Sequence, residues 1–384
     1  MGVACFLFIY MYVSHELSYD QFHEKSDRIY RLAVKASIGD TKIQQTYTSA
    51  ITFSRLLEEF PEIETGVKFL NFGRTPVIVD NKDFYEQNIF AVDSTFFSVF
   101  TNPLVYGDPS RVLAQPNTMV ITRKIAMKYF GHTDVIGEVI QMEVSRTQGV
   151  MDFIITGVSE ELPDNSHFHY DVLISSVTFP DILNRQGWTQ NNFVSYILLK
   201  KGASAPELEA KLIEFNRKYM DMEDYDAWIA KGNFWHFFLQ PIPSIHLTSD
   251  LNGEIEANGN ETYVYIFAVI SLFVLLIASI NFMNLSTAKS SLRAKEVGLR
   301  KVVGSDRSRL IGQFLTESLF LTFISLMLGL LIVESLLPLY QNFIGKALHI
   351  HYFQDFRIIP GLILLGVVIG IVSGSYPAFV LSSF

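Results

Sequence analysis

The sequence predicts a membrane protein with four transmembrane α-helices, the first truncated, and a large α+β extracytoplasmic domain of two subdomains inserted between helices 1 and 2. Three apolar runs, Tyr263–Leu285, Leu310–Leu337 and Ile358–Leu381, exceed the roughly 20 residues that a helix needs to cross about 30 Å of hydrocarbon. A fourth run, Gly2–Val13, opens the chain at about half that length. Residues 14–262, between the first and second runs, are polar enough to fold in water.

The short first run predicts a truncated helix rather than a signal peptide. A secretory signal would carry a basic start and a small-residue cleavage site. Gly2–Val13 has neither, and the polar Ser14 and His15 follow it directly. We therefore expect the start of this helix to be missing, with Met1 internal to a longer protein. Cys5 is the only cysteine, so core packing without disulfides must hold the outer domain together.

The charge distribution predicts the orientation in the membrane. Residues 14–262 hold 21 Lys and Arg against 34 Asp and Glu, whereas residues 286–309 hold seven Lys and Arg against Glu296 and Asp306. Short loops rich in Lys and Arg stay in the cytoplasm. This places the basic loop and both chain ends inside, and 14–262 with Pro338–Arg357 outside. A basic loop this short and tethered to the membrane argues against nucleic-acid binding.

The outer domain is long enough for two subdomains, which we place at about 14–178 with a return segment at 240–262, and at 179–239. Apolar runs and alternation bounded by turn residues predict strands, with hairpin turns at Gly39-Asp40 and at residues 80–83. These strands are Ile29–Lys35, Thr41–Thr48, Arg74–Val79, Glu86–Val92, Thr118–Ile121, Val135–Val144, Met151–Val158, Tyr170–Ser175 and Val194–Lys200, and an aromatic segment covers Trp235–Leu239. Their order predicts mixed sheets rather than repeating βα units.

Three helices are predicted within the outer domain. Thr52–Phe60 has apolar residues at helical spacing and ends before Pro61. A second helix begins after Thr122, a suitable N-cap, and stops at Gly131. A third covers Pro206–Tyr219, after which residues 242–247 lead back towards the membrane.

Motifs for catalysis are missing from these 384 residues. The sequence contains no Gly-x4-Gly-Lys-Ser/Thr loop for nucleotide phosphates, no Gly-x-Ser-x-Gly and no His-Glu-x-x-His. We therefore expect this chain not to be an enzyme and to bind no ATP itself.

Two histidine pairs, His167/His169 and His349/His351, have a spacing that a metal site could use. In a strand this spacing puts both rings on one face. Because no carboxylate or thiol arrangement completes a ligand set, we interpret these histidines as solvated or hydrogen-bonded and expect no metal site. The acidic residues at 221–226 are interpreted as a solvated surface.

Polar and small residues inside the membrane runs mark helix contacts. Gly366, Gly370 and Gly374 repeat every four residues, so they share one helix face that another backbone can approach closely. Glu317 and Glu334 flank the third run; we assign Glu334 to the interface, and Glu317 either to helix packing or to coupling. For Asn281 and Asn284, a capping role and a hydrogen bond across helices both stay open.

The basic loop has helical features of its own. Glu296 precedes Arg300 by four residues, a favourable pair on a helix, and Gly298 and Gly304 limit the helix length. We expect a short helix at the inner surface that binds either anionic lipid or a soluble partner. Charge alone leaves both alternatives open.

The order of motifs resembles the FtsX-like permease domain of bacterial ABC transporters. The matching segments are Ile280-Asn-Phe-Met-Asn-Leu285, Arg293-x-Lys-Glu-Val-Gly-Leu-Arg-Lys-Val-Val-Gly304, Gln313-Phe-Leu-Thr-Glu317 and Gly374-Ser-Tyr-Pro-Ala378. Outside the membrane, Met119-Val-Ile-Thr, Tyr129-Phe-Gly131, Ile136-Gly137 and Phe153-x-Ile-x-Gly-Val158 resemble the periplasmic core of MacB-type permeases. The leader Glu16–His23 fits long permeases of this group. The missing ends indicate a fragment, or half of a two-unit permease.

The resemblance implies a permease domain at 263–384, with helices 263–285, 310–337 and 358–381 and a cytoplasmic coupling loop at 286–309. That loop would seat on a separate ATP-binding subunit, which would bind the ATP and Mg²⁺. The coupling residues would be Arg293, Lys295, Glu296, Val297, Gly298, Arg300, Lys301 and Gly304. Other implied partners are the lipid bilayer, a second permease half, and a periplasmic adaptor with an outer-membrane channel.

The implied function is mechanotransmission. ATP hydrolysis in the partner would move the domain in the periplasm, outside the bacterial inner membrane, and so export drugs, peptides or lipoproteins. One alternative is a non-transporting FtsX-like regulator that activates cell-wall hydrolases. Another is a peptide sensor that works without an ATPase, although the coupling-loop motif argues against it. The sequence does not name the substrate or distinguish a homodimer from a heterodimer.

Overall fold

Apolar and polar segments separate into two compact units in the structure, a computed structural model. It describes residues 1–80, 82–145, 149–183, 187–188, 190–219, 225–292, 307–346 and 358–381. One unit, which we call the membrane unit, consists of Met1–Leu17 and Glu261–Phe384. The other, Ser18–Asn260, is the outer domain. The chain therefore passes between the units twice, at residues 17–18 and 260–261.

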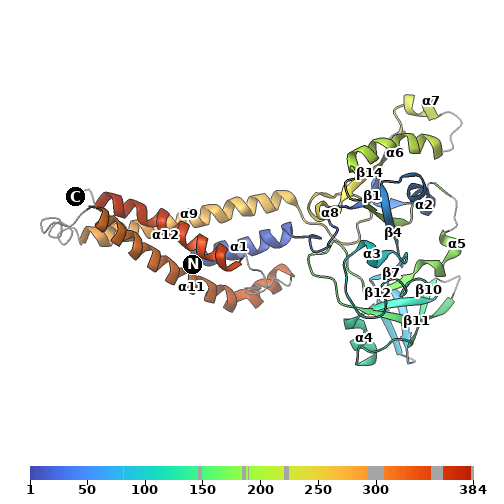
Figure 1. Cartoon of the computed structure of the whole chain (residues 1–384), viewed down its shortest axis with the longest axis horizontal. Helices are drawn as coiled ribbons and strands as arrows, with labels where there is room; N and C mark the ends of the chain where they lie inside the picture. The colour runs from blue at the N-terminus through green and yellow to red at the C-terminus, as the bar shows by residue number, and fades with distance from the viewer. Residues whose placement is uncertain are drawn as a thin grey trace. The chain divides into compact units, whose positions relative to one another are not determined.

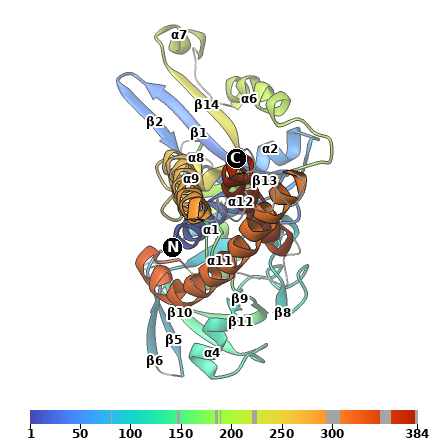
Figure 2. The same ribbon diagram turned by 90° about the vertical axis from the view of Figure 1, so that its left-hand side faces the viewer.

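The membrane unit is built from long helices that are apolar on most faces, which is typical of helices surrounded by lipid. Its helices are α1 (Gly2–Leu17), α9 (Glu261–Leu292), α11 (Arg307–Ile344) and α12 (Ile358–Leu381). Within this unit, α1 packs on α9 and α11, and α12 packs on the same two helices (Figure 1). Figure 2 shows the four helices grouped side by side.

In the described part of the chain, α9, α11 and α12 are long and apolar enough to cross a membrane. The helix α1 has 16 residues, fewer than a span needs. The prediction of three apolar helices together with a large outer domain is confirmed. The count of four spans stays a prediction.

The outer domain is organised around one mixed sheet. Along the described chain the strand order is β14-β1-β13-β4-β7-β12-β9-β11-β10-β5-β6, with β2 on β1, β3 on β13 and β8 on β11. The pairs β9–β11 and β7–β12 are parallel and the others antiparallel. The strands are β1 (Ile29–Ile38), β2 (Thr41–Gln45), β3 (Tyr47–Thr48), β4 (Ile63–Asn71), β5 (Thr75–Val79), β6 (Lys82–Glu86), β7 (Ile89–Val92), β8 (Leu104–Tyr106), β9 (Thr118–Thr122), β10 (Val139–Ser145), β11 (Gly149–Ser159), β12 (Val172–Ser175), β13 (Phe193–Leu199) and β14 (Phe234–Pro241).

Short helices cover parts of this sheet. They are α2 (Ala50–Glu59), α3 (Phe96–Val99), α4 (Arg123–Phe130), α5 (Pro180–Leu183), α6 (Ala205–Tyr219), α7 (Tyr225–Ala230) and α8 (Ile242–Thr248), with a 3₁₀ turn at Ser176–Thr178. Local chemistry sets their ends. Thr122 accepts a hydrogen bond from the Ile125 N–H at the start of α4, and Gly131 ends the helix in a left-handed conformation with φ of 76°. The predicted start and stop of this helix are therefore confirmed.

The prediction for the second hairpin is wrong in its second strand, which is Lys82–Glu86 rather than Glu86–Val92. The strand β5 pairs with β6 around Asp80, whose φ is 49°. Residues 89–92 instead form β7, which pairs with β4 and β12. The turn is tighter than the sequence indicated because Asp80 adopts a left-handed conformation that short polar side chains tolerate.

The two-subdomain layout is not confirmed, because the sheet continues across the predicted division at residue 178. The first strand, β1, lies between β13 and β14, which come from the other predicted subdomain. Figure 1 shows α2 and α6 at the end of the sheet that contains β14, and α4 at the end that contains β10 and β11.

An aromatic cluster fills the centre of the domain and holds one loop and one strand in place. Phe69 contacts Phe96, Phe100, Phe168 and Tyr196 with ring centroids 5.1–5.8 Å apart. All five side chains are buried. Aromatic contacts at these separations add to the stabilisation from burial, so Phe168 holds its loop, and Tyr196 its strand, firmly in the core.

Candidate functional site

The predicted coupling residues, from Arg293 to Gly304, lie outside the described residues. His349 and His351 lie outside them as well. The predicted glycine face of the last helix is described. This glycine face is one of two features whose geometry bears on function. The other is a set of buried polar contacts in the outer domain, which we call the polar joint.

The three glycines of α12 lie against α11. A Cβ atom placed on Gly370 would come within 2.7 Å of Leu319 Cδ2 and 3.1 Å of its Cα, and one on Gly366 within 2.9 Å of the Phe323 ring. On Gly374 it would meet the Ser318 Cβ at 2.7 Å. Cβ contacts under 3.0 Å are essentially never seen, so α11 or its side chains would have to shift to accept a Cβ at any of the three positions.

The other polar residues singled out in the membrane unit lie elsewhere on their helices. Glu317 and Glu334 are exposed on α11, and Asn281 and Asn284 are exposed on α9. The α11 contacts to the glycine face come instead from Ser318, Leu319 and Phe323. A packing role for Glu317 stays a prediction.

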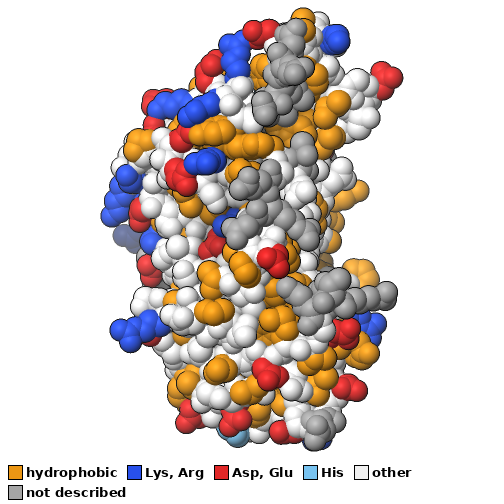
Figure 3. Space-filling view, turned by 90° about the vertical axis from the view of Figure 1, so that its right-hand side faces the viewer, with side chains coloured by type: hydrophobic (Ala, Val, Ile, Leu, Met, Phe, Trp, Pro, Cys, Tyr) orange, Lys and Arg blue, Asp and Glu red, His pale blue; other side chains and the backbone are white. Residues whose placement is uncertain are grey.

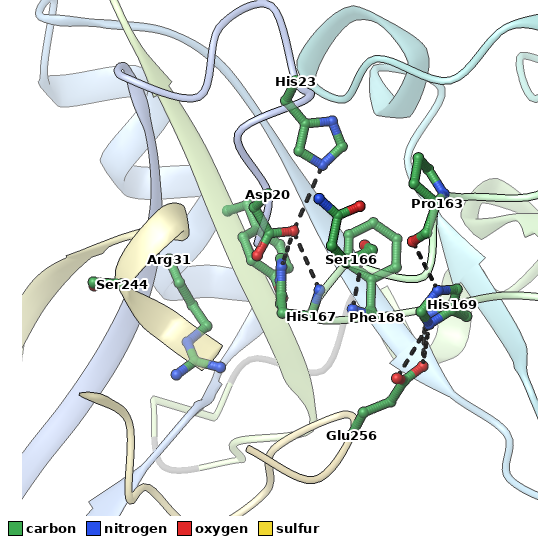
Figure 4. Close-up of polar contacts among 12 residues, drawn as sticks. Asp20, His23, Arg31, Pro163, Ser166, His167, Phe168, His169, Ser244 and Glu256 are labelled. Carbon is green, nitrogen blue, oxygen red and sulfur yellow. Dashed lines mark hydrogen bonds and ion pairs between the residues drawn. The ribbon is translucent and has the colours of Figure 1, made fainter. Parts of the chain in front are cut away.

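The polar joint lies in the two segments of the outer domain that lead to α1 and to α9. We call residues 18–23 the first connector, which follows α1, and residues 249–260 the second connector, which precedes α9. A loop at residues 163–170, here called the clasp loop, holds side chains from both connectors (Figure 4). Phe168, at its centre, is buried in the aromatic cluster, with His167 on one side and His169 on the other.

The first connector is held through Asp20. Its side chain is fully buried, and its Oδ1 lies 2.8 Å from Nδ1 of His167 and accepts the His167 backbone N–H at 3.2 Å. The Asp20 backbone N–H donates to the Asn165 carbonyl at 2.8 Å, and the Asn165 amide donates to the Ser18 carbonyl at 3.0 Å. Asp20 has a φ of 59°, a left-handed conformation that Asp and Asn adopt more readily than most residues.

His23 completes the buried end of this connector. Its Nδ1 accepts the Thr101 backbone N–H at 3.1 Å, so the ring proton lies on Nε2, which faces Asp20 Oδ1 at 3.9 Å. Burial lowers the pKa of His23 to about 4, although Asp20 raises it. A nitrogen that carries a proton cannot bind a metal, so Asp20, His23 and His167 do not form a metal-ligand set in this arrangement.

The second connector is held through two carboxylates. Glu256 accepts the backbone N–H of His169 at 2.7 Å and the His169 Nδ1–H at 2.9 Å. Burial lowers the pKa of the His169 ring, but Glu256, the Pro163 carbonyl and Asp164 together raise it by more, so its pKa lies above the usual value. This contact therefore strengthens below that pKa, where the ring is charged, and weakens as the pH rises through it.

Glu254 pairs with the deeply buried Arg31 of β1. Arg31 Nη1 donates to Glu254 at 2.5 Å, and Nη2 donates to Gln240 at 2.6 Å and Ser249 at 2.8 Å. Arg31 lies directly opposite Tyr196 in the register of β1 and β13. The Tyr196 hydroxyl shares a hydrogen bond of 2.8 Å with His167 Nε2. A continuous set of polar contacts and sheet neighbours thus leads from Asp20 to Glu254.

The order Asp20, His167, Tyr196 has the connectivity of a catalytic triad, but its burial rules out that use. Tyr196 has no exposed surface and Asp20 has none. Burial raises the pKa of the Tyr196 hydroxyl well above its usual value, so this group stays protonated. With no access for a substrate and no ionisable nucleophile, the arrangement is structural.

Sequence reasoning treated His167 and His169 as one pair and missed their separate partners. The clasp loop is not a strand, and the two rings bind carboxylates on different connectors. The signal that could have found Asp20 was the leader Glu16–His23, in which Tyr19 also stacks on His246 of α8 with centroids 3.3 Å apart.

Comparison with known proteins identifies the family. Residues 1–215, more than half of the chain, match the family described as MacB-like periplasmic core domain. Residues 268–384 match the family described as FtsX-like permease C-terminal. The chain belongs to the FtsX/MacB-type permease family. This permease is an inner-membrane protein with a periplasmic domain.

Curated relatives of the permease match most of its length. It is 27% identical over 348 residues to Macrolide export ATP-binding/permease protein MacB 1 of Yersinia pestis bv. Antiqua (strain Antiqua), covering 87% of this chain and 45% of the relative. It is 24% identical over 276 residues to Uncharacterized ABC transporter permease YknZ of Bacillus subtilis (strain 168), covering 69% and 59%. The chain spans about half the length of the curated relatives it matches.

Among solved structures, a domain of a permease protein from Porphyromonas gingivalis aligns with a TM-score of 0.49 at 25% identity, covering 57% of this chain and 91% of that domain. The periplasmic region of MacB from Actinobacillus actinomycetemcomitans aligns with a TM-score of 0.38 at 14% identity, covering 56% and 90%. The family assignment rests on the sequence matches.

Substitution of the glycine face should destabilise the permease selectively. Gly370→Ala places a methyl group against the Leu319 backbone, so α12 must shift, and we expect a loss of about 1–3 kcal/mol of stability. Gly361→Ala is the control, because a Cβ there meets nothing within 4 Å on the same helix. Thermal unfolding of the detergent-solubilised protein should show a lower midpoint for Gly370→Ala alone. Equal midpoints would contradict the close packing.

Acid should destabilise the outer domain through His23. Because its pKa in the folded protein is about 4 and its usual value is 6.5, the unfolded state takes up the proton first as the pH falls. The free energy of unfolding should decrease by about 3 kcal/mol as the pH falls from 6.5 to about 4, since one pKa unit corresponds to about 1.4 kcal/mol. Thermal unfolding measured across this pH range should show a shallower dependence for His23→Gln. The exposed His132→Gln is the control, and equal slopes in all three proteins would contradict the assignment.

Proposed function

We propose that this chain is the permease part of an ABC transporter, in which a separate ATP-binding subunit hydrolyses ATP and the resulting motion reaches the periplasmic domain. The carrying observation is the order of the two family matches, periplasmic core domain before permease domain, within one chain. The outer domain is inserted between α1 and α9. Movement of these helices therefore has a covalent route into it at two points.

The basic loop at 286–309 is proposed to seat on the ATP-binding subunit. Glu296, Arg300 and Lys301 would make polar contacts, and Val297 an apolar one. Arg293, Lys295, Gly298 and Gly304 complete the coupling motif. Short basic loops stay in the cytoplasm, where such a subunit binds. The ATP and Mg²⁺ belong to that subunit, and this chain takes part in catalysis only by coupling.

A transporter of this design needs further parts. We propose that α1 forms a fourth span and that a second permease half, identical or different, pairs with this one. A periplasmic adaptor and an outer-membrane channel would extend the export route. The glycine face of α12 would hold α11 and α12 at close spacing while the bundle moves.

The proposed substrates are drugs, peptides or lipoproteins that have already reached the outer side of the membrane. One relative is named for macrolide export, which supports a hydrophobic drug as the first candidate. The net acidity of residues 14–262 would suit cationic substrates, but acidic and basic side chains are interspersed over the face shown in Figure 3. Charge therefore gives little support for a cation preference.

Coupling is tested by a pull-down from native membranes with the full-length protein. An ATP-binding-cassette subunit should co-purify and be lost from the variant Glu296→Lys with Lys301→Glu, because both contacts change sign. The control is the same exchange at Arg55 and Glu58, an exposed pair 2.6 Å apart on α2 of the outer domain. An ATPase retained by the coupling variant would contradict the assigned loop, and no ATPase in any sample would contradict the transporter.

A further inference from the structure

We infer that the clasp loop and its buried partners join the two connectors into one mechanical body, so that α1 and α9 act on the outer domain together rather than independently. Asp20, His167, His169, Arg31, Glu254 and Glu256 are the positioning residues of this joint. The inference rests on the proposed function for its purpose, but its structural content can be tested without transport or ATP hydrolysis.

The shortest link between the connectors is the clasp loop itself. His167 contacts Asp20 of the first connector, and His169 contacts Glu256 of the second. The two histidines are separated only by Phe168, which is buried and packs 5.1 Å from Phe69 and 5.1 Å from Phe100. Because the loop is fixed in the core between its two contacts, neither connector can move away without disturbing the other's partner.

A second link crosses the sheet. His167 shares a hydrogen bond with Tyr196 of β13, Tyr196 lies opposite Arg31 of β1, and Arg31 binds Glu254 of the second connector. Arg31 and Tyr196 are both fully buried. Removing one partner from a buried charged pair is strongly destabilising because the other charge is left uncompensated. The contacts of this second link are therefore costly to break where it passes through the core.

A third link runs through α8. Tyr19 of the first connector stacks on His246 with ring planes 3° apart, and the His246 carbonyl accepts the Gly259 N–H of the second connector at 2.8 Å. Three links thus join the same two segments: the first two share the Asp20–His167 contact, and the third runs separately through α8. A flexible tether would need none of them, since Gly- and Ser-rich linkers work without fixed contacts.

Each connector also has backbone amides whose protection reports its attachment. In the first connector the Asp20 N–H donates to the Asn165 carbonyl at 2.8 Å. In the second, the Asn252 N–H donates to the Gln44 carbonyl at 2.9 Å and the Gly259 N–H to His246. Amides of this kind exchange with solvent through local opening, so hydrogen exchange measures how firmly each connector is held.

The decisive experiment is hydrogen exchange of the full chain in detergent, comparing the native protein with Asp20→Asn. Asn keeps the left-handed backbone and an acceptor oxygen but removes the charge beside His167. We expect exchange to rise on the order of tenfold in residues 18–23 and also in 249–260, because a hydrogen bond to a charged group is stronger than one to a neutral group. Faster exchange confined to the first connector would overturn the inference.

Asp93→Asn is the matched control. Asp93 is a partly buried carboxylate that binds the Lys68 ammonium at 3.0 Å and the Ser176 hydroxyl at 2.8 Å, with no contact to either connector among its described hydrogen bonds. Its substitution should accelerate exchange near Lys68 and Ser176 and leave both connectors unchanged. A response of the connectors equal to that of Asp20→Asn would mean a general loss of stability and would also overturn the inference.

The reciprocal variant Glu256→Gln keeps the proposal testable if Asp20→Asn does not fold. Glu256 is partly exposed, so this substitution is milder. The inference expects faster exchange in residues 18–23, on the far side of the clasp loop, and acceleration limited to 249–260 would contradict it. These readouts need no ATPase, so they can fail or succeed separately from the pull-down that tests the proposed function.

Discussion

The outer domain depends on one buried charge. Arg31 lies in β1, between β13 and β14, and has no exposed surface. A guanidinium in such a place is tolerated only when it is paired and hydrogen-bonded, and its partners are Gln240, Ser249 and Glu254. Two of these belong to the second connector. The demand of one buried cation for carboxylate oxygen therefore determines where the chain runs as it leaves the sheet towards α9.

The same logic extends from Arg31 to the rest of the joint. Tyr196 lies opposite Arg31 and binds His167, whose ring contacts Asp20 of the first connector. In the membrane unit the constraint is different, because the glycine face of α12 works by the absence of side chains rather than by charge. Close helix packing in one unit and a polar joint in the other are both compatible with a permease whose spans move while the folded outer domain keeps its internal structure.

Local chemistry made much of the fold predictable, and long-range pairing made the rest inaccessible. Thr122 and Gly131 mark the ends of α4, and the glycines at 366, 370 and 374 indicate a contact face, because caps and helix periodicity are written in neighbouring residues. The pairing of β1 with β13 and β14 was not predictable, since it depends on segments about 160 to 210 residues away.

The joint shows the same limit. Asp20 and His167 are 147 positions apart, and Arg31 and Glu254 are 223 apart. The coupling residues from Arg293 to Gly304 lie outside the described residues and stay a prediction from the sequence.

The central claim is that ATP-driven motion enters the outer domain through two connectors that stay fixed to each other. It is tested most directly by distances between spin labels in the full-length protein with its ATP-binding subunit, with and without ATP. One pair joins the exposed Gln21 and Ala257, one in each connector, and a second joins Ala257 to the exposed Ser335 of α11. The account predicts that ATP changes the Ala257–Ser335 distance and leaves the Gln21–Ala257 distance unchanged. Separation of Gln21 from Ala257 on ATP binding, or no change in either distance, would contradict it.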